Sequence, residues 1–99
     1  MHPETDEILK KLKAHRRAIK AYGVRSLGLF GSYARGEQRR RSDLDFVVEF
    51  ERKSFDAYMD LKAYLENLFE RRVELVISDT IKPRLRGTIL REAVDAPGL

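Results

Sequence analysis

The spacing of apolar residues changes several times along this 99-residue chain, and each change predicts an element of secondary structure. Over Leu44–Phe50 every second residue is apolar, which is typical of a strand with one buried face. The short apolar segments Val24–Phe30 and Val73–Ile77 also predict strands. Strands separated by helical segments favour a small sheet with helices packed against it.

Three segments carry apolar residues at intervals of three and four, which predicts helices. The first spans Glu4–Tyr22, and the second spans Ser54–Arg71, whose first residue is a natural N-cap. The third starts at a cap formed by Asp79 or Thr80 and runs through Val94. The resulting fold class is α/β (α+β), a small sandwich of sheet and helices.

Only three strands are predicted, which is few for a sheet. We expect an additional short strand or the edge of an oligomer to complete it. Residues Asp95–Leu99 resemble a frayed tail. His15 falls on the apolar side of the first helix, where packing is a more common role than ligand binding.

Length and composition exclude several classes of protein. A chain of 99 residues suffices for one domain, so residues 1–99 are expected to form a single domain without a lid or a second recognition module. No apolar segment approaches the ~20 residues of a membrane span, and the first residues lack the apolar region of a signal peptide. Without cysteine, disulfide scaffolds and cysteine nucleophiles are excluded, and a cytoplasmic location is expected.

The net charge of +4 is modest, and the basic residues gather in Lys10–Lys20, Arg39–Arg41 and Lys82–Arg86. Nucleic acid would explain such clusters, and so would a polyanion such as a nucleoside triphosphate. The first cluster is typical of the solvated face of a helix. Aromatic residues do not alternate with the basic ones, which argues against a surface for single-stranded nucleic acid.

Two short motifs at strand ends carry the chemistry. Gly31 lets the backbone approach an anionic ligand closely, and Ser32 adds a hydroxyl donor at the same turn. Asp43 and Asp45 are two residues apart on a strand, so both point to one face with Cα atoms about 7 Å apart. Their carboxylates can converge on one or two Mg²⁺ ions, which keep open positions for substrate phosphates.

Glu74 supplies a third carboxylate from a different strand. Its neighbours in the strand are apolar, and a buried carboxylate would need a metal or another partner to offset its burial. The alternative is that Glu74 faces solvent on a half-exposed sheet.

These motifs resemble the signature of the minimal nucleotidyltransferase (MNT) family, within the DNA polymerase β superfamily. The residues that carry the resemblance are Gly31-Ser32-x-Ala34-Arg35-Gly36 and Ser42-Asp43-x-Asp45. The segment Lys82–Val94 is similar to the C-terminal helix of that family. The resemblance implies a nucleotidyltransferase palm with a small mixed sheet, which uses Mg²⁺ and transfers AMP from ATP to a hydroxyl.

The resemblance also assigns roles to residues of this chain. Asp43 and Asp45 would bind metal, and Glu74 would stand at the third carboxylate position, where the family generally has Asp. The nucleotide-binding residues would be Gly31, Ser32, Arg35 and Ser42. From the residues alone, Arg35 could equally pair with Glu37 or Asp43.

MNT proteins that are paired with HEPN ribonuclease toxins act as antitoxins and can adenylylate a tyrosine of the toxin. The resemblance therefore implies a protein adenylyltransferase with a HEPN-type toxin as partner, in a homo- or hetero-oligomer, with nucleic acid involved only through the toxin. The length of the chain agrees with a partner protein. The palm takes up nearly all of the 99 residues, so we expect a separate protein to present the acceptor hydroxyl. Two alternatives remain, namely an impaired antitoxin that neutralises its partner by complex formation, and a nucleic-acid-binding module.

Overall fold

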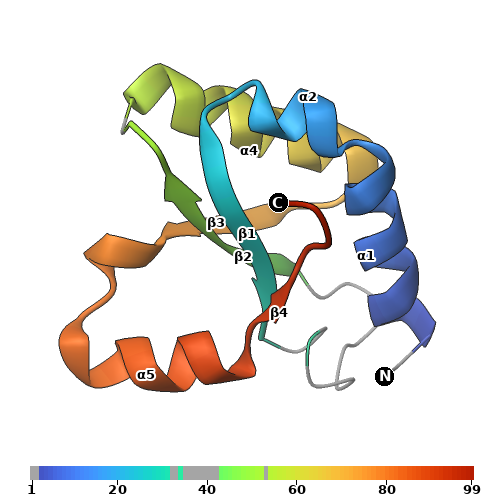
Figure 1. Ribbon diagram of the computed structural model, residues 1–99. Helices are drawn as coiled ribbons and strands as arrows, with labels where there is room; N and C mark the ends of the chain where they lie inside the picture. Colours follow the sequence, from blue (N-terminus) through green and yellow to red (C-terminus); the bar gives the residue numbers. More distant parts are fainter. Residues whose placement is uncertain (1–2, 32–33, 35–42, 53) are drawn as a thin grey trace.

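The computed structural model describes residues 3–31, 34, 43–52 and 54–99. Within these residues the chain forms one four-stranded sheet with the strand order β3-β2-β1-β4 (Figure 1). The strands are β1 (Val24–Phe30), β2 (Leu44–Phe50), β3 (Val73–Ile77) and β4 (Val94–Asp95). β1 runs antiparallel to both β2 and β4, whereas β2 and β3 are parallel. The predicted mixed sheet and the bounds of its three longer strands are confirmed.

The first predicted helix is divided in two at His15, giving α1 (Pro3–Ala14) and α2 (Arg16–Lys20). At the break the N–H of His15 is shared between the carbonyls of Lys11 and Leu12, at 3.2 Å each. Nδ1 of His15 lies 3.0 Å from the hydroxyl of Tyr64, so the ring is held by a hydrogen bond within the fold. The prediction of a single helix over Glu4–Tyr22 was therefore wrong. The helix is interrupted at His15, whose ring is hydrogen-bonded to Tyr64, a residue distant in sequence.

Helix α4 (Phe55–Phe69) follows the prediction more closely. Ser54 is its N-cap, and its Oγ accepts from the N–H of Ala57 at 3.3 Å. The helix ends because Glu70 adopts a left-handed conformation with φ of 52°. α4 connects β2 to β3, and a crossover of this length is what parallel neighbours require.

The C-terminal part differs from the prediction. Residues Ser78–Thr80 form a 3₁₀ turn, η1, and helix α5 (Pro83–Glu92) begins only at Pro83, so the predicted cap at Asp79 or Thr80 was wrong. Proline suits this first position because the N–H that it lacks would have no partner in the helix.

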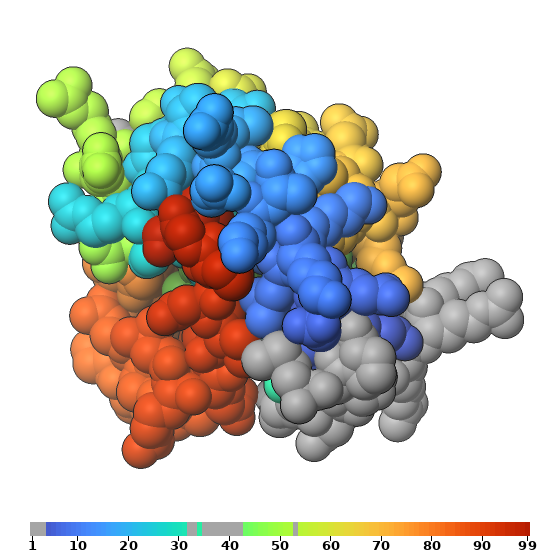
Figure 2. All heavy atoms as spheres, turned by 45° about the vertical axis from the view of Figure 1, so that its right-hand side comes forward, coloured from blue at the N-terminus to red at the C-terminus, as the bar shows by residue number. Residues whose placement is uncertain are grey.

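The last residues are packed against the fold. β4 is the additional short strand that the sheet was expected to need. Beyond it, Ala96 is buried and its N–H donates to the carbonyl of Leu27 at 2.8 Å, and Leu99 packs against the core. Figure 2 shows this C-terminal segment, in red, seated against the blue N-terminal helices. The predicted frayed tail was therefore wrong.

The core lies between the sheet and helices α1, α2 and α4. β2 buries every second side chain on this side, as its alternation predicts, and helices α1, α2 and α4 cover them with Leu12, Ile19, Leu61 and Leu65. α5 contributes no buried residue and lies apart from α1, α2 and α4 (Figure 1). Among the described helices, none has the length and apolar character needed to span a bilayer.

The opposite side of the sheet, termed the open face, carries Asp45, Val47 and Glu49 of β2. Strand pairing places Phe30, Gly28 and Ser26 of β1 opposite these three residues. Of the predicted site residues, Asp45 and its strand partner Glu74 lie on the open face.

Strand β3 lies at the edge of the sheet, and side chains occupy several of its outward backbone groups. The hydroxyl of Tyr58 donates to the carbonyl of Leu75 at 2.7 Å. The N–H that begins the strand donates to Oε2 of Glu66 at 3.1 Å, and the carbonyl that ends it accepts from Oγ1 of Thr80 at 2.8 Å. These contacts join β3 to α4 and η1, and the pairing of β3 with β2 places Glu74 beside Asp45.

Candidate active site

Asp45 is the centre of the candidate site, because strand pairing places it between two other elements. Its partner in β1 is Phe30, which directly precedes Gly31, and its partner in β3 is Glu74. Directly paired residues of neighbouring strands project to the same face, so Asp45 and Glu74 share the open face. Asp43 stands two residues earlier, just before β2 begins, and alternation directs it to the same side.

Gly31 lies in close contact with Asp45. Its φ of 74° is in the left-handed region, which favours glycine. A Cβ atom at Gly31 would overlap Oδ2 of Asp45 and would lie 3.0 Å from Cγ and 3.2 Å from Cβ of that residue. Glycine is therefore needed at this position both for its backbone conformation and for the space that the Asp45 carboxylate occupies.

Of the remaining predicted site residues, the structure describes Glu74 only. Ser32, Arg35 and Ser42 lie outside the described residues. Glu74 is exposed, so the argument that it would be buried in the sheet was wrong, and its description as a solvent-facing residue fits better. The register of β2 and β3 places Glu74 beside Asp45.

The three carboxylates suit a hard divalent cation in kind, since Mg²⁺ prefers oxygen ligands. Within the described ranges, however, no three His, Cys, Asp or Glu side chains are grouped closely enough to hold a metal ion. The fold therefore aligns Asp43, Asp45 and Glu74 on one face without gathering them into a finished three-ligand site.

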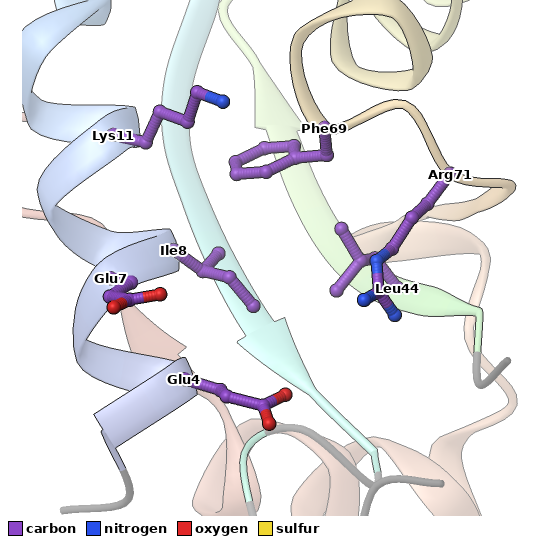
Figure 3. Close-up of a pocket in the computed structure, with 7 residues that line it drawn as sticks. All are labelled: Glu4, Glu7, Ile8, Lys11, Leu44, Phe69 and Arg71. Carbon is purple, nitrogen blue, oxygen red and sulfur yellow. The ribbon is translucent and has the colours of Figure 1, made fainter. Parts of the chain in front are cut away.

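A cavity of about 380 Å³ lies behind β2, on the side of the helices (Figure 3). Glu4, Glu7, Ile8 and Lys11 of α1 line one wall, and Leu44, Phe69 and Arg71 line the other. Leu44 points into the core, whereas the neighbouring aspartates point to the open face. The sheet therefore separates this cavity from Asp43, Asp45 and Glu74.

A second cavity, of about 240 Å³, lies on the open face between the sheet and α5. Val47, two residues beyond Asp45, lines it together with Gly28 of β1 and Arg86 of α5. Arg86 belongs to the basic cluster Lys82–Arg86 of the sequence, but its place at this cavity depends on the fold, which brings α5 over this part of the sheet. This space and the aspartates occupy one continuous side of β2.

Comparison with known proteins identifies the family. Residues 6–96 match the nucleotidyltransferase domain. The protein adenylyltransferase MntA of Thermococcus cleftensis is 42% identical over 91 residues, which are 90% of this chain and 92% of that protein.

Solved structures agree with this match. One that has been described provisionally as a minimal nucleotidyltransferase is 41% identical with a TM-score of 0.72, over 87% of this chain and 93% of that chain. A chain from the complex of tri-AMPylated Shewanella oneidensis HEPN toxin with MNT antitoxin shares the fold, with 19% identity and a TM-score of 0.67, over 96% of this chain and 73% of that chain. The predicted enzyme class and palm fold are confirmed, and the chain belongs to the nucleotidyltransferase domain family, among the minimal nucleotidyltransferases.

Proposed function

We propose that this nucleotidyltransferase transfers AMP from ATP to a hydroxyl, such as that of a tyrosine, on a HEPN-type toxin, and thereby acts as its antitoxin. Support comes from the relative named protein adenylyltransferase and from the fold shared with the MNT antitoxin complex. The single observation that carries the proposal is the position of Asp45, packed over Gly31 and paired with Glu74 across two strands. We further infer that residues 1–99 form one domain that acts in the cytoplasm.

The proposed reaction forms a bond between the acceptor oxygen and the α-phosphorus of ATP, and breaks the bond from that phosphorus to the bridging oxygen of pyrophosphate. Gly31 and Ser32 would hold the triphosphate through backbone N–H and hydroxyl donors, and Arg35 and Ser42 would add contacts to it. Asp43 and Asp45 would hold Mg²⁺, and Glu74 would receive the proton of the acceptor hydroxyl. Bound Mg²⁺ would supply positive charge that stabilises the attacking and leaving oxygens.

A second function is favoured by the placement of Glu74. Glu74 is exposed and is not gathered with the two aspartates into a metal-binding group among the described residues. A third carboxylate misplaced by about 1 Å can cost about 10²-fold in rate. On this alternative the chain neutralises the toxin by binding it, without modifying it.

Intact mass of the co-expressed toxin decides between the two functions. Transfer predicts mass increments of whole AMP units, and loss of the aspartates in Asp43→Ala/Asp45→Ala should abolish them. The matched control is Asp56→Ala/Asp60→Ala, which removes two exposed aspartates of α4, on the far side of the sheet, and should leave the increments unchanged.

The variant also tests the antitoxin effect. If Asp43→Ala/Asp45→Ala abolishes the mass increment but still protects cells from the toxin, neutralisation proceeds by binding and the catalytic antitoxin is wrong. If the double variant still modifies the toxin, the proposed site is wrong. A comparison of Glu74→Gln with Glu74→Asp separates a proton acceptor from a bystander, because only the former loses activity in Gln and retains it in Asp.

A further inference from the structure

The cavity between α5 and the open face is lined by residues of β1, β2, η1, α5 and β4, and it lies along β2 from Asp45. Its floor is Gly28 of β1, and a Cβ there would lie 3.3 Å from Oδ1 of Asp95 and 3.4 Å from side-chain carbons of Val47 and Ala93. Arg86 and Leu90 line it from α5. The absence of a side chain at Gly28 therefore helps to keep this space open.

The size and place of the cavity suit one part of a substrate. Its volume of about 240 Å³ is smaller than the ~300–1,000 Å³ of sites that enclose a whole small ligand. Val47 lies two residues beyond Asp45, so their Cα atoms are about 7 Å apart along β2. A group attached to a phosphate held at Asp43 and Asp45 can thus reach the cavity.

Arg86 contributes a buried donor without a partner. Its side chain is half-buried, and its Nε is fully buried with no hydrogen-bond partner in the described part of the chain. Buried polar groups of proteins are nearly always hydrogen-bonded, so this N–H is a candidate for a ligand contact. The planar guanidinium can also stack on an aromatic ring.

We propose that this cavity binds the base of the nucleotide and that Arg86 is a base-binding residue; the inference rests on the proposed function. The lining combines apolar side chains such as Leu90 with donors such as Arg86 and acceptors such as Asp95. The edge of adenine carries both an amine donor and ring-nitrogen acceptors, which such a lining satisfies. A tyrosine acceptor fits less well, because its only polar atom must lie at the reacting phosphorus.

Calorimetric titration with two ligands in the presence of Mg²⁺ tests the assignment. ATP carries a base, whereas inorganic tripolyphosphate carries only the phosphate chain. Arg86→Met should weaken ATP binding about tenfold, the size expected for one hydrogen bond from a charged donor, and should leave tripolyphosphate binding unchanged. The matched control is Arg84→Met, an exposed arginine of the same helix, which should change neither affinity.

Unchanged tripolyphosphate binding also shows that the Arg86→Met protein is folded. Equal weakening of both ligands would mean that Arg86 binds phosphate and would overturn the assignment, and so would unchanged ATP binding. If ATP binding is unchanged while the KM for the toxin rises, the cavity receives the acceptor side chain and the base assignment is wrong. If the wild-type protein binds neither ligand, the proposed function itself fails, which is a separate result.

Discussion

Replacing Gly31 by Ala is predicted to disable the site while leaving the protein folded. The new Cβ requires Asp45 to move, since it would overlap Oδ2 and lie 3.0 Å from Cγ. The carboxylate can rotate away, at about 0.5–1.5 kcal/mol for a side chain forced off its preferred rotamer. The left-handed φ of 74° adds about 1–2 kcal/mol for any residue with a Cβ. The expected total is a loss of about 1.5–3.5 kcal/mol in the free energy of unfolding.

The effect on activity should be larger than the effect on stability. A displacement of about 1 Å at a reacting group can cost about 10²-fold in rate, and rotation of the Asp45 carboxylate is of that order. Urea denaturation would give the stability loss, and AMP transfer to the toxin, followed by intact mass over time, would give the rate.

Gly23 provides the matched control. Its φ of 84° is equally left-handed, but a Cβ there meets nothing within 4 Å. Gly23→Ala should therefore cost about 1–2 kcal/mol of stability and leave transfer unchanged. If Gly31→Ala and Gly23→Ala have the same transfer rate, the close contact between Gly31 and Asp45 does not position the carboxylate, and the reasoning fails.

Three further changes test the fold by urea denaturation. Leu65→Ala removes a fully buried core side chain and should cost about 2–5 kcal/mol, whereas Met59→Ala on the same helix, where the side chain is 44% exposed, should cost under about 1 kcal/mol; equal losses would contradict the core assignment. Tyr58→Phe removes the hydrogen bond to the carbonyl of Leu75 and should cost about 1 kcal/mol, and no change would show that this bond does not stabilise β3. Truncation after Asp95 removes the Ala96 hydrogen bond and the Leu99 contact and should cost about 1–3 kcal/mol, whereas a frayed tail would cost nothing.

Local patterns were sufficient to predict the long strands. The alternation in Leu44–Phe50 reports directly which side chains are buried, so both the span and the core face of β2 follow from it. Two signals competed at the last helix, where Asp79 is a favourable cap but Pro83 is a favourable first residue, and the helix begins at Pro83. The division at His15 and the pairing of β4 with β1 depend on contacts distant in sequence, which no local pattern reports.

In the candidate site, too, some features follow from local pattern and others depend on the fold. Placement of Asp43 and Asp45 on one face needs only the alternation of a strand. The pairing of Asp45 with Glu74 requires the register of two strands separated by a helix, and the contact with Gly31 requires the fold of the turn as well. The basic cluster Lys82–Arg86 was recognised in the sequence, but the burial of Arg86 within it depends on how α5 lies over the sheet.

The side chains along the outer edge of β3 also limit how other proteins can bind. Glu66, Tyr58 and Thr80 interrupt the row of backbone donors and acceptors that an incoming strand would need. Strand exchange and fibril growth from this edge are thereby disfavoured. On the proposed function, a toxin that binds at this edge would therefore contact side chains of β3 and its neighbours, and would not add a strand to the sheet beside Glu74.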